Sequence, residues 1–418
     1  MQLQKLSLIN FRAFKQANFE FKPGMNLIVG INGVGKSSVL DAIRVMFSQI
    51  IPKISQSKSK RISFQQGDVY KGETYFEISM DFITLVTPMS MNGKFEQRLK
   101  SSYKPNNKRI FDELKRSDSQ PLVAYYSPSR SLSDLKETGN TKDIEDRREF
   151  AFLDSLADRE LRLQEFIDWF RVQDAQGQED GDKIIYRKNT KLFTDALHVF
   201  MEKYTDIRVE EEILPEKLDK DNNIVKQKPK AELLLNKDGS TINAKQLSDG
   251  ERGILSLVLD LSRRLAYANP ALGNPLEGKA LVLIDELDLH LHPGWQRDSV
   301  KKLKATFPNC QFIATTHSPQ IVGEVPPENI IILEDGKPPK TPNQSYGMDS
   351  NWILDVLMGT QDRNSTILGK LTVIETLIDE RNFSTAQKNI ADLRLETGDF
   401  PELAKLETRI HRIQTLGK

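Results

Sequence analysis

The first thirty residues alternate between apolar and polar side chains. A repeat of two places every second side chain on one face of an extended chain, so this pattern predicts half-buried strands. Two later segments, 74–87 and 122–126, also favour strands. The apolar positions that carry the pattern in the first thirty residues are Leu3, Leu6, Leu8, Phe19 and Phe21.

Two short apolar runs occur in the second half of the chain, at 280–285 and 311–315. Each is bounded by polar residues, which is typical of strands buried on both faces of a parallel sheet. Between them and the first strands, residues 206–236 favour a β-hairpin with a charged turn at 219–223. The chain therefore combines strands of both kinds, and its fold class is predicted to be α/β.

Helical periodicity appears in three segments, at about 143–174, 191–203 and 351–414. In each of them apolar residues recur at helical spacing among charged ones. Prolines at 326–327 and 338–342 separate the last segment from the strands and predict a boundary there. The final segment is therefore expected to form a small helical appendix.

Bulk composition adds three limits. The 418 residues carry 59 Lys and Arg against 59 Asp and Glu, so the total charge indicates no partner. Cys310 is the single cysteine and lies in an apolar-flanked segment, so we expect its side chain to be buried in the core. One cysteine allows no disulfide within the chain, which suits a cytoplasmic location. The chain starts on a strand pattern rather than a leader, and no apolar run of about 18 residues predicts a membrane span.

Two polar, basic stretches, 48–64 and 92–118, leave two interpretations open. Clustered Lys and Arg favour a surface that faces nucleic acid. The same composition is also typical of solvated loops and strand edges.

The most specific local signal is the string from Gly30 to Ser37, which fits G-x-x-x-x-G-K-[ST] without a gap. An apolar strand-like run precedes it and a helix-like run follows, the context in which this motif binds a triphosphate. Lys36 is expected to reach the β- and γ-phosphates and Ser37 to hold Mg²⁺. An ordinary glycine turn before a helix is the alternative. The ATP-binding residues predicted here are Gly30, Asn32, Gly33, Gly35, Lys36, Ser37 and Ser38.

A second motif, Leu247-Ser248-Asp249-Gly250-Glu251-Arg252-Gly253, precedes an apolar-periodic helix. It is similar to the signature motif of ABC-type ATPases, in an S-D-G-E form. Ser248 and the Gly250 amide are placed at a helix N-terminus, where an anion is stabilised. In ABC-type ATPases this motif contacts the γ-phosphate bound by a second subunit. A plain polar helix cap is the alternative.

The run 280–284 followed by Asp285 and Glu286 matches a Walker B strand. Asp285 is expected to support Mg²⁺ through water, and Glu286 to orient or deprotonate the attacking water. Leu287-Asp288 resembles the D-loop, which touches the opposite subunit in ABC-type ATPases. His290 and His292 leave a metal interpretation open, but their spacing suits only a strand or irregular turn, so packing within the loop is the default.

A strand ending in Thr-His, at residues 312–318, places His317 where ABC-type ATPases have their switch histidine. His317 is expected to hydrogen-bond the γ-phosphate or the water. Two weaker predictions complete the site. Gln66, next to Gln65, lies where a Q-loop is expected. Arg12 belongs to an Asn-Phe-Arg motif that resembles the start of RecF and SMC ATPases. Core packing by the neighbours of Arg12 explains that motif equally well.

These four ordered motifs resemble the ABC-type head of RecF, SMC and OLD-like ATPases, in its compact AAA-type form. The resemblance implies a P-loop head with an N-terminal antiparallel subdomain and a mostly parallel sheet flanked by helices. It divides the chain into 1–130 and 237–340 as the halves of the head, 131–236 as a helical and β-hairpin insertion, and 345–418 as a helical tail. ATP and Mg²⁺ are the implied cofactors.

Segments in the head and tail resemble the PtuA ATPases of Septu and some retron anti-phage systems: Leu122–Arg130, the signature, 286–293 and 352–359. The chain lacks the long arms of SMC proteins, and after His317 it has no Asp-x-Asp pair of the kind that a TOPRIM nuclease needs. The resemblance implies a homo-oligomer with ATP sandwiched between heads and a separate HNH nuclease partner of the PtuB kind. DNA or a retron nucleic acid–reverse transcriptase complex is a further implied partner; a RecF-like DNA clamp without nuclease is the alternative.

Overall fold

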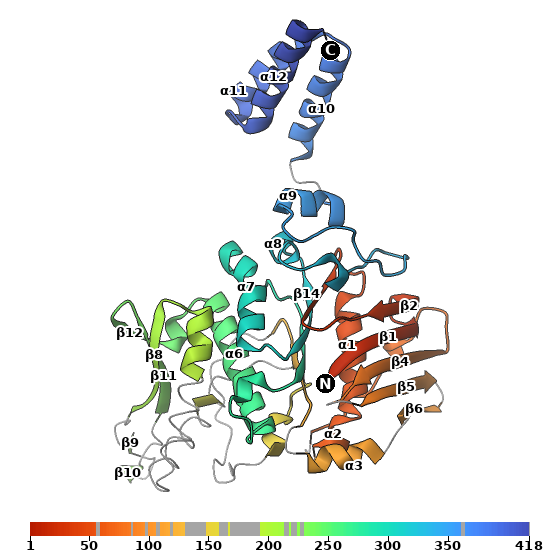
Figure 1. Cartoon of the computed structure of the whole chain (residues 1–418), viewed down its shortest axis with the longest axis vertical. Coiled ribbons are helices and arrows are strands. Elements are labelled where there is room, and N and C mark those ends of the chain that lie inside the picture. Colours follow the sequence, from red (N-terminus) through yellow and green to blue (C-terminus); the bar gives the residue numbers. More distant parts are fainter. Residues whose placement is uncertain are drawn as a thin grey trace. The chain divides into compact units, whose positions relative to one another are not determined.

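The computed structural model divides the chain into two compact units, Met1–Ile353 and Leu354–Lys418, which are described separately (Figure 1). The division falls slightly after the start of 345 predicted for the tail. None of the helices among the described residues is both long and apolar enough to cross a bilayer. The structure describes residues 1–55, 59–84, 87–96, 99–105, 109–117, 120–129, 148–158, 166–167, 193–212, 217–218, 224–225, 230–360 and 364–417.

An antiparallel sheet of five strands forms the first part of unit 1, in the order β2-β1-β4-β5-β6. Its alternating strands bury one face, where Phe11, Phe64 and Phe76 pack edge to face. The strands predicted in the first thirty residues and at 74–87 are confirmed. The bounds are β1 Gln2–Phe11, β2 Phe14–Glu20, β4 Tyr75–Ile83, β5 Pro88–Glu96 and β6 Leu99–Pro105.

A second sheet has the order β15-β3-β14-β13-β7, and every pair in it is parallel. Its strands are buried throughout, as their unbroken apolar runs predict. The sheet joins strands from before and after the 131–236 segment. The bounds are β3 Met25–Val29, β7 Leu122–Tyr126, β13 Ala280–Ile284, β14 Gln311–Thr316 and β15 Ile330–Ile332.

The prolines at 326–327 mark no boundary between the two units. After Pro326-Pro327 the chain re-enters the parallel sheet as β15, and the backbone of Ile332 then pairs with Lys340. Proline lacks a backbone N–H donor and fixes φ. Here Pro327 lies in the short 3₁₀ turn Pro327–Asn329, which leads into an edge strand, and both positions tolerate these limits.

Helices cover the parallel sheet. Helix α1 (Lys36–Ser48) contacts β13 and β14, while α6 (Asp249–Ala268) contacts β7. Inside α6, the fully buried Arg264 is paired with Asp260, and its guanidinium also donates to the carbonyls of Ala151 and Leu153. The other helices of unit 1 are α2 Ile51–Ile54, α3 Arg109–Arg116, α7 Pro293–Thr306, α8 Pro319–Val322 and α9 Ser350–Trp352.

The long helix expected at 143–174 is wrong for residues 148–158, which form the 3₁₀ turn Arg148–Ala151 and further turns. These residues instead surround the buried Arg264. Its guanidinium donates hydrogen bonds to two of their carbonyls, which in a helix would accept backbone amides. Apart from Phe166 and Ile167, which are helical, the rest of that segment lies outside the described residues. The second expected helix is confirmed at 193–200.

The predicted hairpin is confirmed. Strand β8 (Tyr204–Glu212) pairs antiparallel with β11 (Lys230–Lys237), which pairs with β12 (Ser240–Asn243). The short strands β9 (Lys217–Leu218) and β10 (Ile224–Val225) pair with each other, and the expected charged turn lies outside the described residues.

Unit 2 is a three-helix assembly of α10 (Ser365–Asp379), α11 (Phe383–Thr397) and α12 (Pro401–Leu416), as the helical pattern of the tail predicts. A π-helical turn, Ile353–Leu357, spans the division between the units. The apolar core of unit 2 comprises Leu371, Ile374, Ile378, Ala386, Ile390, Leu393, Leu403, Leu406 and Ile410.

Candidate functional site

The glycine-rich loop lies between β3 and α1, as its motif predicts. Gly35 is the N-cap of α1 and no side chain caps this helix, so its first amides are available to an anion. Gly35 has a φ of 101°, and a Cβ there would lie 2.8 Å from the ring of Phe14. A Cβ at Gly30 would collide with the carbonyl oxygen of Leu333. Both positions therefore require glycine.

Lys36 folds back over this loop. Its ammonium group donates to the carbonyls of Gly30, at 2.8 Å, and Ile31, at 2.9 Å. Burial lowers the pKa of Lys36, although the carboxylates of the 285–288 segment favour the charged form. The side chain is thus close to those acids and poised beside the loop, while Ser37 is exposed and Ser38 is half-buried at the start of α1.

Asp285 and Glu286 follow β13 at the carboxyl edge of the sheet. The hydroxyl of the fully buried Thr315, on β14, donates to Asp285 Oδ1 at 2.5 Å and accepts the Glu286 amide at 2.7 Å. Thr315 also accepts the Leu287 amide through its carbonyl. One threonine on the neighbouring strand therefore fixes the position of both acids.

The next threonine on β14 makes a parallel link. Thr316 Oγ1 donates to Asp288 Oδ1 at 2.7 Å, and the same oxygen accepts the His317 amide at 3.1 Å. Burial lowers the pKa of His317, and the charge of Lys36 lowers it further. His317 is therefore in range of Lys36, and its neutral imidazole is favoured.

Two positions with a strained backbone lie in the loop that follows β13. Glu286 has a φ of 51° and His290 a φ of 60°, both in the left-handed region that non-glycine residues rarely adopt. Such conformations persist where the surrounding contacts hold them, and they cluster at functional sites. At Glu286, the hydrogen bond from its backbone amide to the Thr315 hydroxyl helps to hold this conformation.

The signature motif starts α6, and Ser248 is its N-cap. Ser248 and Glu251 form a capping box: Ser248 Oγ accepts the Glu251 amide at 3.4 Å, while Glu251 Oε2 accepts the Ser248 amide at 2.9 Å. A Cβ at Gly250 would collide with the carbonyl of His290, so the helix start packs directly on the strained loop.

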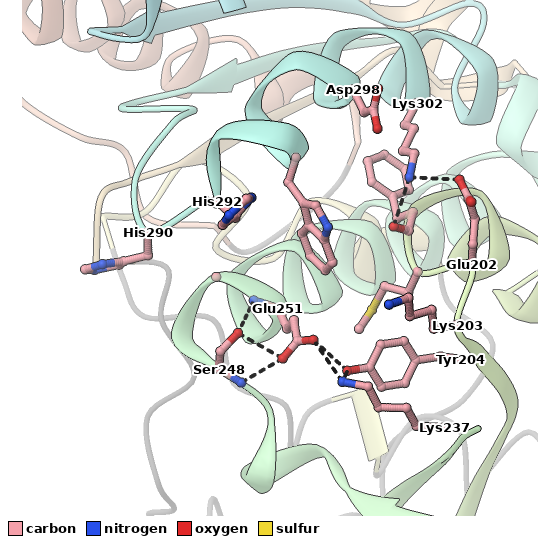
Figure 2. Close-up of a pocket in the computed structure, with 14 residues that line it drawn as sticks. Glu202, Lys203, Tyr204, Lys237, Ser248, Glu251, His290, His292, Asp298 and Lys302 are labelled. Carbon is pink, nitrogen blue, oxygen red and sulfur yellow. Dashed lines mark hydrogen bonds and ion pairs between the residues drawn. The ribbon is translucent and has the colours of Figure 1, made fainter. Parts of the chain in front are cut away.

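A cavity of about 430 Å³ opens beside this helix start (Figure 2). His290 and His292 lie on its wall, and His292 Nδ1 accepts the Gly294 amide as the N-cap of α7. Within the described residues, no group of three or more His, Cys, Asp and Glu side chains is arranged to hold a metal ion. Both histidine side chains are exposed in this loop.

The two weaker predicted residues have different environments. Arg12, at a φ of 47°, donates to Asp41 of α1 at 2.7 Å and to Asp68 at 2.8 Å. It therefore joins the first hairpin to the helix that follows the glycine-rich loop. Gln66 is exposed at the start of the 3₁₀ turn Gln66–Asp68, two residues before Asp68.

Some of the basic residues proposed to face nucleic acid are used within the fold. Lys94 pairs with Glu77 and Glu96, and the ammonium group of Lys53 lies over the ring of Phe111. Part of both basic stretches, including residues 56–58 and 106–108, lies outside the described residues. Cys310 is buried as predicted, and burial raises the pKa of its thiol to about 12.

A family profile described as "AAA domain, putative AbiEii toxin, Type IV TA system" matches residues 25–323. The chain belongs to this family, AAA_21. The match begins at β3 and includes the glycine-rich loop, the signature, the acidic strand and the histidine. The matched range therefore covers the sheet edge described above, with its glycine-rich loop, acids and histidine, and the start of α6, where the signature lies.

Curated relatives of this AAA_21 chain bear out the resemblance stated from its sequence. "Retron Ec83 probable ATPase" of Escherichia coli is 28% identical over 87% of this chain and 77% of its own length. "Septu protein PtuA" of Bacillus thuringiensis is 26% identical over 91% of this chain and 90% of its own length. A crystal structure of the Smc head bound to a domain of ScpA gives a TM-score of 0.48 at 17% identity, over 82% of this chain and 98% of that one.

The predicted fold class is confirmed by the antiparallel five-stranded sheet, the parallel five-stranded sheet and the helices of unit 2. The sequence motifs single out neither Thr315 nor Tyr204. For Thr315, a threonine at a strand end beside an acidic strand end is a usable signal. Tyr204 had no signal, because its partner Glu251 lies 47 residues away in the sequence.

Proposed function

We propose that this chain is the ATP-binding and ATP-hydrolysing subunit of a bacterial anti-phage defence system. The observation that carries the proposal is the convergence at one edge of the parallel sheet. The loop after β3, the acids after β13 and the histidine after β14 meet there, linked through Thr315 and Asp288. In open α/β sheets this edge is where ligands bind.

In the proposed reaction, Glu286 accepts a proton from the attacking water or orients it, and His317 hydrogen-bonds the γ-phosphate or that water. Lys36 exchanges its two loop carbonyls for phosphate oxygens. The exposed Ser37 hydroxyl and Asp285 are the groups that would hold Mg²⁺, which neutralises charge developing on the phosphates.

The second half of each site is proposed to come from another copy of the chain. Ser248 and the Gly250 amide, at the start of a 20-residue helix, would contact the γ-phosphate bound by that copy. A homo-oligomer with ATP sandwiched between heads follows, and loss of the γ-phosphate would loosen it. That change is the signal passed to the partner.

The proposed partner is a separate HNH-type nuclease that cleaves DNA. The names of the relatives, retron ATPases and Septu PtuA, support a role in defence. Unit 2 offers a surface for such a partner, since Val373, Leu395 and Leu416 are exposed on it. The insertion, which holds β8 and β11, is the other proposed partner surface.

The test is Glu286→Gln with ATP and Mg²⁺. Turnover is expected to fall about 10²- to 10⁴-fold while nucleotide binding is retained, because only the acid–base step is removed. Glu324→Gln is the matched control, since Glu324 pairs with Arg297 on the surface and is expected to leave turnover unchanged. Equal hydrolysis by Glu286→Gln and the unaltered chain would overturn the assignment.

Copurification with the product of a neighbouring HNH gene tests the partner. If no such protein binds and the chain alone binds DNA with a steep loss of affinity as salt rises, the RecF-like clamp replaces the nuclease-regulating role.

A further inference from the structure

Glu251 joins two parts of the molecule that are distant in sequence. Its Oε2 atom accepts both the amide and the hydroxyl of Ser248, each at 2.9 Å. Its Oε1 atom accepts the hydroxyl of Tyr204 at 2.6 Å and pairs with Lys237 Nζ at 3.6 Å. Figure 2 shows this carboxylate between Ser248 on one side and Tyr204 and Lys237 on the other.

Tyr204 and Lys237 are cross-strand partners on β8 and β11, the insertion hairpin, whose second strand ends one residue beyond the predicted bound of 236. Lys237 donates to the Tyr204 hydroxyl at 3.0 Å and its ammonium group lies over the tyrosine ring. Tyr204 is buried, so its hydroxyl has a fixed direction toward Glu251. Lys237 is more exposed and adds charge to the same contact.

A capping box alone would not need these two residues. Ser248 and Glu251 already satisfy each other at the helix start. The contact from the insertion holds the second carboxylate oxygen, and it therefore sets the rotamer of Glu251. That rotamer in turn determines where the Ser248 hydroxyl points, because Ser248 Oγ donates to Glu251 in the free chain.

We propose that Tyr204, assisted by Lys237, is a positioning residue for Ser248 and acts through Glu251. The inference rests on the proposed function, in which Ser248 meets the γ-phosphate bound by a second copy. Engagement of that phosphate requires the Ser248 hydroxyl to turn from Glu251, and the hydrogen bond and charge that Tyr204 and Lys237 supply to this carboxylate weaken its hold on that hydroxyl. The contacts of the insertion hairpin with Glu251 then affect the strength of the contact between two heads. When the heads close, the same hydrogen bonds transmit the change to the hairpin.

The experiment measures ATP-dependent self-association of the full chain by analytical ultracentrifugation, in the Glu286→Gln background that retains ATP. Tyr204→Phe is expected to weaken self-association about threefold to tenfold, the range for loss of a hydrogen bond to a charged group that is transmitted in part. Binding of ATP to a single chain is expected to be unchanged. In the chain with Glu286 intact, turnover of Tyr204→Phe is expected to recover at high protein concentration, which a merely structural defect would not do.

Tyr126→Phe is the matched control. It removes another buried tyrosine hydroxyl that donates to a carboxylate of the same helix, Asp260, at 3.1 Å. It is expected to leave self-association unchanged. Thermal unfolding of each variant shows that the chain is folded, and Lys237→Met serves as a second, milder break of the same contact.

A double-mutant cycle separates this inference from the proposed function. If Tyr204 acts through Ser248, the Tyr204→Phe change adds nothing once Ser248→Ala is present. If Ser248→Ala weakens self-association and Tyr204→Phe does not, or if their effects simply add, the positioning role is wrong while the sandwich stands. If Ser248→Ala leaves ATP-dependent self-association intact, the sandwich itself is wrong.

Discussion

Two regions of unit 1 hold polar groups in fixed positions by different means. At the acidic edge of the parallel sheet, Thr315 and Thr316 bind residues 285–288 from the adjacent strand, whose pairing brings them together. At the start of α6, Glu251 is held by side chains from β8 and β11. The first region depends on a strand register, and the second depends on how the insertion packs against the helix.

The difference bears on how each region responds to change. The buried Thr315 hydroxyl bonds both Asp285 and the Glu286 amide, so its loss removes a hydrogen bond from each of them at once. The contacts at Glu251 are partly exposed and several in number. We therefore expect the sheet edge to be rigid and the helix start to be adjustable, as a contact that opens and closes must be.

The largest effect is expected from Thr315→Val, which keeps the shape of the side chain and removes its hydroxyl. Turnover should fall about 10- to 100-fold, as for other residues that orient a metal-supporting ligand. The free energy of unfolding should fall by about 1–3 kcal/mol, because the Glu286 amide and Asp285 lose a buried partner. Steady-state kinetics and denaturant titration measure both.

Thr315→Ser retains the hydroxyl and is expected to restore most of the activity. If Thr315→Val hydrolyses ATP like the unaltered chain, the sheet edge is not fixed by this residue and the contrast between the two regions fails.

A smaller effect, on the free energy of unfolding, is expected from alanine substitutions at two glycines of α6. Gly250→Ala should lower the free energy of unfolding by about 1–3 kcal/mol, because its Cβ collides with the His290 carbonyl and the loop must shift. Gly253 has nothing within 4 Å of such a Cβ. Gly253→Ala should therefore raise stability by up to about 1 kcal/mol through helix propensity.

Denaturant titration of both variants measures the pair. Equal changes in the free energy of unfolding would mean that the start of α6 does not pack closely on the loop at His290. The contrast between the sheet edge and the helix start would then lack this support.

The smallest expected effect is a pH dependence at the sheet edge. The pKa of His317 lies below its ordinary value of 6.5, because burial and then Lys36 disfavour the charged ring. The unfolded chain thus binds a proton more readily. The stability contribution of neutral His317 is complete above pH 6.5 and is lost as the pH falls through the lower folded value.

Thermal unfolding across this range should show a shallower acid loss for His317→Gln than for the unaltered chain. In Lys36→Met, nuclear magnetic resonance titration should give a higher pKa for His317. An unchanged value would place Lys36 too far from the imidazole to matter.

Much of the site followed from local patterns. The glycine-rich loop, the acidic strand and the Ser248 cap each depend on neighbours within a few residues, so their strands and helices were predictable. The prolines at 326–327 misled, because an edge strand follows them. The turns at 148–158 also escaped prediction, since their carbonyls serve Arg264 more than 100 residues away.

The sequence by itself determined the family, the order of the motifs and the elements that carry them, because glycine geometry, apolar periodicity and helix capping act over short distances. Only the tertiary structure decided that Thr315 holds both acids, that Glu286 adopts a left-handed backbone, and that Tyr204 and Lys237 reach Glu251. These are contacts between distant segments, and their existence depends on strand register and packing that no local pattern records.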